Sequence, residues 1–228
     1  MGLIDNLESA TRKMDWKAKG TEWADYYEDT NYSINAINHK KKSVADFLDK
    51  TNPGIVWDIG ANDGLFSRIA SDKKMLTISF DIDPAAVQKN YLQSVKNNEE
   101  YILPLLLDLT NPSPGIGWEN TERISLIHRG PADTAFSLAL IHHLAISNNL
   151  PIGKIANFFN SICKSLIIEF VPKDDSQVQR LLSTREDIFP DYTQQAFESE
   201  FRKHFIISST IKIKDSKRTM YLMKKKEN

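Results

Sequence analysis

The segment that most constrains this chain is residues 56–64, Val-Trp-Asp-Ile-Gly-Ala-Asn-Asp-Gly. It begins as an apolar strand, reaches an acid at Asp58 and continues into a loop of small residues. Gly60 and Gly64 lack a Cβ and permit close approach and unusual dihedral angles, while Asn62 tolerates a left-handed conformation. A strand that runs through such a loop into a helix brings backbone N–H groups close to a ligand. An ordinary strand-to-helix turn is the alternative interpretation.

Beyond this segment, strand patterns alternate with helix patterns. Strands are predicted at 55–58, 76–81, 101–108, 135–141 and 165–171, and helices at 65–71, 84–95, 152–162, 178–182 and 196–205. Two further strands, at 206–213 and 219–223, form a predicted terminal hairpin. Alternation of this kind predicts an α/β fold with a mostly parallel, doubly wound sheet of seven strands, because parallel crossovers are right-handed and carry helices to both faces.

Residues 1–50 differ in composition, with two of the four tryptophans and a run of lysines at positions 40–42. We expect an N-terminal helical cover over 1–50 and one catalytic domain over 51–228. The lysine run is interpreted as a solvated helix face, with a phosphate- or substrate-binding role as the alternative.

Charge and cysteine usage exclude several classes of protein. The formal net charge is -1, so no overall basic field attracts nucleic acid or an anionic membrane. The single cysteine, Cys163, cannot form an intrachain disulfide or a zinc cluster, and no metal site is predicted. The first residues lack a secretory signal, and the apolar stretches are too short to span a bilayer. These features predict a soluble cytoplasmic protein without a membrane partner, either a monomer or a homodimer.

An acid stands at the end of each of the first three predicted strands: Asp58, Asp81 and Asp108. In an open α/β sheet, ligands bind outside the carboxyl ends of the strands, where these side chains would converge. Asp81 could accept from both hydroxyls of a ribose. Taken singly, each acid could equally be a helix cap or a solvated loop residue. Asp83, directly before Pro84, is predicted to be such a cap.

This combination resembles the first three motifs of class I S-adenosylmethionine-dependent methyltransferases, over about residues 55–171. Asn62 stands where that pattern usually has its middle glycine, between Gly60 and Gly64. The resemblance implies a Rossmann-like fold with a C-terminal antiparallel hairpin strand and an N-terminal helical extension. It also implies S-adenosyl-L-methionine as cofactor, with Asp58 and Gly60 facing its methionine part, in the loop that contains Asn62 and Gly64.

The same resemblance assigns the remaining cofactor contacts. Asp81 would hold the ribose, and Asp108 with Leu109 would frame the adenine. Residues 132–144 are similar to the fourth motif and the His-His-Leu that follows it in many methyltransferases of small molecules. Ala139 and the histidines at 142 and 143 would then lie beside the transferable methyl group. A core position for one histidine and an exposed helix start for the other is the competing interpretation.

Several later segments, and Trp23 to Tyr27, resemble bacterial methyltransferases described as nodulation-related. The implied function is methyl transfer to a small-molecule acceptor by in-line displacement at the sulfonium methyl. For a hydroxyl acceptor, a histidine tuned near pH 7 is the natural base, His143 first and His142 second. Glu169 and Tyr27 are candidates to orient the substrate.

Three alternatives stay open. From residue 200 to 228 there are nine Lys and Arg against three Asp and Glu, which fits an RNA-directed enzyme but also a solvated edge hairpin. A protein-directed enzyme or a non-catalytic binding module would carry the same motifs. A nicotinamide dehydrogenase is disfavoured by the spacing of the glycines. The identity of the acceptor and the methylated atom do not follow from the sequence.

Overall fold

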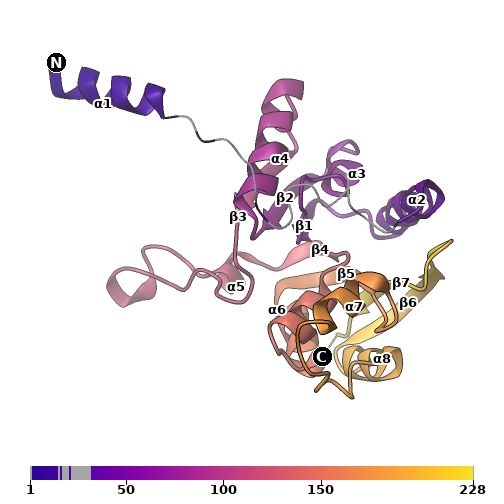
Figure 1. Cartoon of the computed structure of the whole chain (residues 1–228). Coiled ribbons are helices and arrows are strands. Elements are labelled where there is room, and N and C mark those ends of the chain that lie inside the picture. The colour runs from indigo at the N-terminus through magenta and orange to yellow at the C-terminus, as the bar shows by residue number, and fades with distance from the viewer. Residues whose placement is uncertain (1, 15, 17–20, 22–31, 228) are drawn as a thin grey trace.

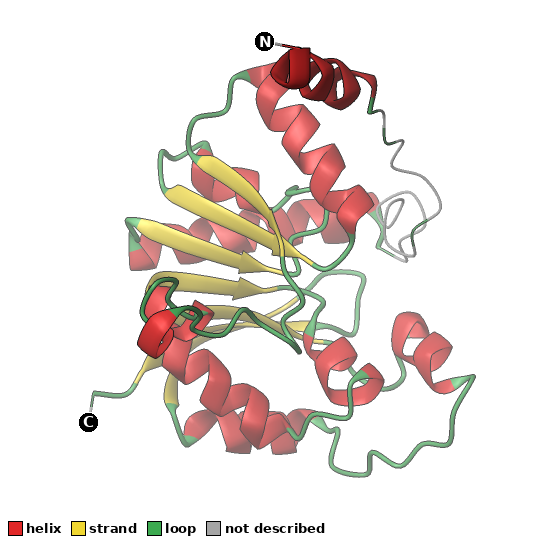
Figure 2. Cartoon of the chain, turned by 90° about the vertical axis from the view of Figure 1, so that its left-hand side faces the viewer, coloured by secondary structure: helices red, strands yellow, loops and turns green. Residues whose placement is uncertain are grey.

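The computed structural model describes residues 2–14, 16, 21 and 32–227. A single seven-stranded sheet runs through it in the order β3-β2-β1-β4-β5-β7-β6 (Figures 1 and 2). The strands are β1 (Ile55–Ile59), β2 (Leu76–Asp81), β3 (Ile102–Leu106), β4 (Ala132–Ser137), β5 (Cys163–Phe170), β6 (Phe205–Lys212) and β7 (Thr219–Lys225). Strands β1 to β5 pair in parallel, and β7 pairs antiparallel with both β5 and β6. This confirms the predicted doubly wound sheet and its antiparallel hairpin strand.

Helices cover both faces of the sheet. The α-helices of the described residues are α1 (Gly2–Lys13), which stands apart, and α2 (Ile34–Thr51), α3 (Ser67–Ser71), α4 (Pro84–Asn97), α5 (Leu126–Arg129), α6 (Ile152–Ile162), α7 (Ser176–Leu182) and α8 (Gln194–Arg202). A short π-helix, η2 (His143–Ser147), follows β4, and a 3-10 turn, η1, covers Trp118–Asn120. Helices α2 and α3 share one apolar cluster with the sheet, whereas α6 and α8 share another.

The two clusters meet opposite faces of the same strands. In β5, Ile167 packs with α2 and α3, while Leu166 and Ile168 pack with α6 and α8. Burial on both sides is why these strands read as nearly continuous apolar runs instead of alternating ones. The sheet is therefore packed on both faces along the strands that lead to the carboxyl-end edge.

Several predicted boundaries shift for local reasons. The strand predicted at 135–141 ends at Ser137, because Ala139 has a left-handed backbone (φ 51°) that no strand accommodates. The helix predicted from residue 65 begins at Ser67. The helix predicted over 196–205 ends at Arg202, since β6 begins at Phe205. The predicted cap at Asp83 is confirmed: its carboxylate accepts from the backbone N–H groups that begin α4.

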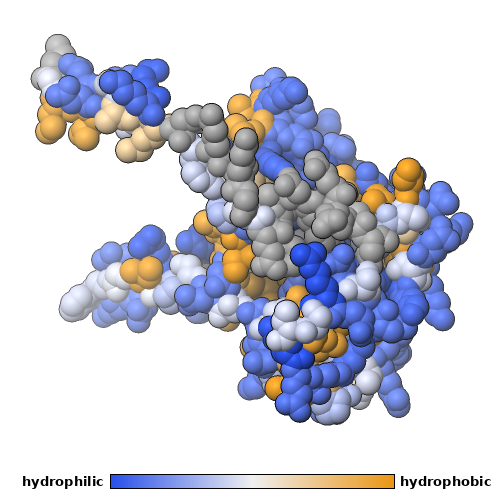
Figure 3. Space-filling view, viewed as in Figure 1, coloured by the Kyte–Doolittle hydropathy of each residue, from blue (hydrophilic) through white to orange (hydrophobic). Residues whose placement is uncertain are grey.

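The N-terminal region contains two different helices. Helix α1 has no buried residue and stands away from the sheet in Figure 1, with its apolar side chains along one side in Figure 3. Helix α2 instead packs into the core through Ala36, Val44 and Phe47. Trp23 and Tyr27 lie outside the described residues, and the division into 1–50 and 51–228 stays a prediction. In the part of the chain described here, no helix has the length and apolar character needed to cross a membrane.

Truncation of a central core residue should cost much more than truncation of an edge residue. Phe136 in β4 is fully buried, and Phe136→Ala should lower the free energy of unfolding by about 3–5 kcal/mol. The matched control, Ile206→Ala on the edge strand β6, removes a side chain that is 56% exposed and should change it by about 0.5 kcal/mol or less. Urea unfolding of both variants measures the difference, and equal losses would contradict this placement of the core.

Candidate functional site

A cavity of about 270 Å³ opens at the carboxyl ends of β1, β2, β3 and β4. Eight of the residues predicted from the sequence line it: Asp58, Gly60, Asn62, Asp81, Asp108, Leu109, Ala139 and His143. The other two predicted residues, Gly64 and His142, do not lie on its wall. The topology thus brings predicted residues that are far apart in the sequence into one pocket; Asp58 and His143 are separated by 85 positions.

The loop after β1 forms one wall with its backbone. The N–H groups of Gly60 and Ala61 both donate to the carbonyl oxygen of Phe80 at 2.9 Å, which ties the loop to β2. Gly60 has a left-handed backbone (φ 78°), and a Cβ there would lie 3.1 Å from Cδ1 of Leu140. Asn62 is also left-handed (φ 51°). A residue with no side chain is therefore needed at Gly60, and a residue that tolerates φ > 0 at Asn62.

Asp58 is the most deeply buried acid of the cavity, only 2% exposed. Its Oδ2 accepts a hydrogen bond from the Ser67 hydroxyl at 2.6 Å. Burial raises the pKa of Asp58 to about 6, while the Ser67 hydrogen bond opposes this rise, as does the nearby charge of Lys40. The carboxylate is therefore mostly ionised at neutral pH, in a place where an anion is poorly solvated and a ligand cation would be favoured.

Asp81 and Asp108 each have a backbone role besides facing the cavity. The two oxygens of Asp81 accept from the N–H groups of Asn62 (2.7 Å) and Asp83 (2.8 Å), and burial raises its pKa. Asp108 accepts from the N–H of Thr110 (2.8 Å) and from its hydroxyl (2.7 Å) through Oδ1. Both acids thus bind backbone N–H groups of neighbouring loops, and both also line the pocket. A carboxylate has about four lone-pair sites in all, so each acid keeps acceptor capacity for a ligand.

Gly64 serves packing between helices. Its backbone is left-handed (φ 81°), and a Cβ there would lie 2.5 Å from the Asn90 side chain of α4 and 2.7 Å from the Arg68 side chain of α3. The glycine therefore allows α3 and α4 to come together behind the loop. Its place in the motif reflects this contact, and the structure does not bring it to the cavity wall.

The segment that follows β4 lines the cavity and has an unusual backbone conformation. Ala139 is a non-glycine residue with φ 51°, and the π-helix η2 begins four residues later. Both conformations are uncommon, and both recur at functional sites. They place His143 on the wall and turn His142 into the core, where it is 1% exposed and its Nδ1 has no hydrogen-bond partner among the described residues.

The predicted tuning of a histidine near pH 7 is wrong. Burial, together with the positive charge of Arg218, lowers the pKa of His143 to about 4. Burial also lowers the pKa of His142 well below its usual value. Both imidazoles are therefore neutral at physiological pH. The neutral ring of His143 can accept a proton or a hydrogen bond, although it is a weaker base than a free histidine.

Beside the cavity lies a cluster of buried charges that joins three parts of the chain. Lys40 of α2 donates to Oε2 of Glu169 in β5 at 2.7 Å, and their side chains are 2% and 0% exposed. Arg218 forms a second buried pair with Asp175, with Nε 2.7 Å from Oδ2. The hydroxyl of Tyr32 accepts from Lys40 (3.1 Å) and Arg218 (2.7 Å) and donates to Glu169. Tyr32 and Lys40 also line the cavity.

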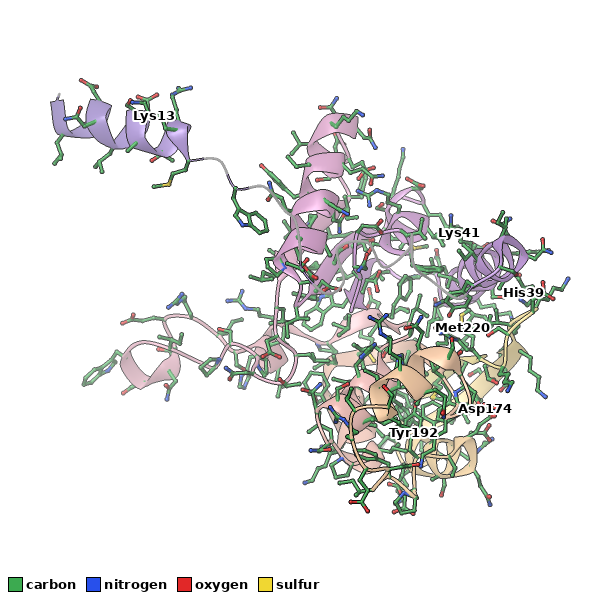
Figure 4. All side chains as sticks on the ribbon, in the orientation of Figure 1. Lys13, His39, Lys41, Asp174, Tyr192 and Met220 are labelled. Carbon is green, nitrogen blue, oxygen red and sulfur yellow. The ribbon has the colours of Figure 1, made fainter. Side chains whose placement is uncertain are left out.

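This cluster corrects two sequence-based interpretations. Lys40 is not part of a solvated face, because it is 2% exposed and lies on the side of α2 that packs into the core. Its sequence neighbours His39 and Lys41 are labelled in Figure 4. Its spacing of four from both Ala36 and Val44 places it on that apolar stripe, a signal that was present in the sequence. Glu169 does not face a substrate, since both of its oxygens bind the cluster. Tyr27, the other residue expected to orient substrate, lies outside the described residues.

The chain is similar in sequence to a known bacterial protein. No protein-family model matches the chain. Nodulation protein NoeA of Rhizobium meliloti (strain 1021) is 37% identical over 210 residues, which cover 92% of this chain and 44% of that protein. The chain thus spans less than half the length of that relative. The match agrees with the predicted resemblance to nodulation-related proteins.

Solved structures identify the fold. N-methyltransferase NodS from Bradyrhizobium japonicum WM9 superposes with a TM-score of 0.61 at 9% identity, over 86% of this chain and 99% of that one. The 16S rRNA methylase RmtB gives a TM-score of 0.56 at 13% identity, over 84% of this chain and 64% of that one. The fold is therefore that of the S-adenosylmethionine-dependent methyltransferases, as the strand-end acids and the glycine loop predicted.

Removal of the buried charge at Asp58 should stabilise the unliganded protein at neutral pH. The folded-state pKa of about 6 lies above the ordinary value of 3.8, so the folded state binds more protons between these values and loses stability as pH rises through them. Asp58→Asn should therefore raise the free energy of unfolding by about 1–3 kcal/mol at pH 7, with the gain shrinking below about pH 4. Denaturant unfolding across this pH range is the measurement, with exposed Asp72→Asn as control. A gain independent of pH would argue against a buried, ionised Asp58.

The Lys40–Glu169 pair should show strong coupling. Lys40→Met leaves Glu169 buried without its partner and should lower the free energy of unfolding by about 3–5 kcal/mol. In Lys40→Met/Glu169→Leu the loss should be smaller than the sum of the two single losses, because neither charge remains. Exposed Lys42→Met is the matched control and should have little effect. Additive losses in this double-mutant cycle would contradict the pairing.

Proposed function

We propose that this chain is an S-adenosylmethionine-dependent methyltransferase that acts on a small-molecule acceptor. The observation that carries the proposal is the convergence of Asp58, Asp81 and Asp108 with the Gly60 loop on one cavity, within a methyltransferase fold. Three acids delivered by successive parallel strands are the arrangement that open α/β sheets use to hold a nucleoside ligand.

The residues present fit the proposed cofactor. The missing Cβ of Gly60 leaves the loop backbone open to the cavity, where a side chain would meet Leu140. Asp58 offers a buried anion for the cationic methionine part, and Asp81 offers acceptors for the ribose hydroxyls. Asp108 would accept from the adenine amino group, with Leu109 against the ring. When bound, S-adenosylmethionine would supply a methyl group carried on a sulfonium, and the neutral thioether S-adenosylhomocysteine would be the leaving group.

The chemistry of the acceptor end favours a small molecule. We place the acceptor near His143, and the cavity lining also includes Leu138, Leu144 and Leu181 with the polar groups of Ser147 and Asn148. The one lysine on the wall, Lys40, is already paired with Glu169, and no arginine lines the cavity, so among the described residues no unpaired cation faces the pocket to meet a phosphate.

The basic C-terminal hairpin gives little support to an RNA-directed function. Of its basic residues, Arg218 is buried against Asp175, and Lys217 contacts Asp174, which Figure 4 labels. Lys212 lies on β6, the edge strand of the sheet, where lysines discourage pairing with other strands. This supports the solvated-hairpin interpretation of the charge excess.

His143 is the proposed proton acceptor for the reacting group of the substrate. It lines the cavity and is neutral at physiological pH, so its imidazole can accept a hydrogen bond from a hydroxyl or amine. The remaining contribution of the chain is orientation of the acceptor and exclusion of water by the leucine wall.

Calorimetry with S-adenosylhomocysteine tests the binding site. The unmodified protein should bind this product, and Gly60→Val should weaken binding about tenfold or more, because a β-branched residue is strained at φ > 0 and meets Leu140. Gly54→Ala is the matched control, since a Cβ there makes an ordinary 3.4 Å contact. Absence of heat with the folded, unmodified protein would refute the proposal, as would preferential binding of NAD.

Transfer of a labelled methyl group from S-adenosylmethionine into a fractionated cell extract tests the acceptor class. Label should enter the small-molecule fraction, and His143→Ala should reduce its incorporation about a hundredfold while leaving cofactor affinity unchanged. Label in RNA or in protein would instead assign the alternative acceptors. Cofactor binding without incorporation into any fraction would indicate a non-catalytic binding module.

A further inference from the structure

A chain of buried hydroxyl groups ends on Asp58. The Ser79 hydroxyl of β2 donates to the Ser67 hydroxyl of α3 at 2.7 Å, and Ser67 donates to Oδ2 of Asp58 at 2.6 Å. Ser67 and Ser79 are 0% and 2% exposed. Asp58 and Ser79 are direct neighbours in the register of β1 and β2, so the sheet itself fixes the two ends of the chain.

The direction of these hydrogen bonds follows from the proton count. A hydroxyl has one proton, and an ionised carboxylate can only accept. Ser67 must therefore give its proton to Asp58, and it can then only accept from Ser79. Both hydroxyl dipoles point their positive ends toward the carboxylate, an arrangement in which each bond strengthens the other.

We propose that Ser67 and Ser79 are positioning residues that hold one oxygen of Asp58 and keep the carboxylate ionised, so that it meets a cationic group of the bound ligand. This inference rests on the proposed cofactor and concerns its methionine end, where the amino group and the sulfonium are the cations. Neither serine lines the cavity, so both act through Asp58.

The charged groups around Asp58 do not by themselves keep its carboxylate ionised, so the Ser67 hydroxyl has an effect on its pKa. Asp81 of β2 raises the pKa of Asp58, and Lys40 of α2 lowers it, but Lys40 is shared with Glu169. Burial is the largest influence and leaves the pKa at about 6. Only about one pH unit thus separates Asp58 from half-protonation at neutral pH. Loss of the Ser67 hydrogen bond would move the pKa upward into the physiological range.

Titration calorimetry with S-adenosylhomocysteine between about pH 6 and pH 8.5 tests the proposal. Ser67→Ala should weaken binding by about three- to tenfold at pH 7, and the loss should largely disappear near pH 8.5, where Asp58 is ionised again. Ser79→Ala should give a smaller shift of the same kind. Ser67→Thr, which keeps the hydroxyl, should bind as the unmodified protein does.

Two controls separate positioning from a general structural effect. Ser71→Ala removes a buried hydroxyl of the same helix that bonds to the backbone of Arg68, and it should leave the pH profile unchanged. 5′-Methylthioadenosine lacks the amino-acid end, so its affinity should not respond to Ser67→Ala. A loss that is equal at all pH values, or no loss at all, overturns the inference while the proposed cofactor site stands. Failure of the unmodified protein to bind either ligand overturns both.

Discussion

The buried contact between Lys40 and Glu169 is the interaction on which the site depends. It joins α2, near the N-terminal end of the described core, to β5 in the middle of the sheet. Tyr32 connects this pair to Arg218 and Asp175, so segments separated by 186 positions meet at one hydroxyl. Two cations and two carboxylates balance each other inside the protein, which is the condition for keeping such groups away from water. The cavity wall formed by Tyr32 and Lys40 is fixed by this balance.

Two acids of the cavity, unlike Glu169 in this cluster, are destabilised in their ionised form. Asp58 and Asp81 are buried acids whose pKa values are raised, which means that the folded protein stores unfavourable electrostatic energy there. The left-handed backbone at Ala139 adds local strain beside them. A ligand with a positive charge and hydroxyl groups would relieve part of this cost on binding. Stability and recognition therefore oppose each other at the strand ends, as is common at functional sites.

The sequence predicted what depends on local pattern. Alternating strand and helix segments indicated the sheet, and the position of Asp58, Asp81 and Asp108 after apolar runs indicated the crevice. The serine chain could not be predicted, because Ser67 and Ser79 meet Asp58 only through the register of β1 with β2 and the start of α3. The Arg218–Asp175 pair likewise depends on tertiary contact.

Other failures had local causes. The lowered pKa of His143 follows from burial, which a sequence does not show at single positions. The packing role of Gly64 between α3 and α4 does not show in its motif position, because both requirements select a glycine. Lys40 is the exception, since its place on the apolar stripe of α2 was visible in the spacing.

The order of the strands has a consequence for folding of the chain during synthesis on the ribosome. Strand β7 follows β6 in the chain but lies between β5 and β6 in the sheet. Until β7 leaves the ribosome, one edge of β5 has no paired strand. Asp175 also lacks its ion-pair partner, because Arg218 directly precedes β7. The nascent chain therefore cannot complete its sheet before β7 is synthesised. Until then the unpaired edge of β5 is the place where a chaperone that binds exposed strand edges would act.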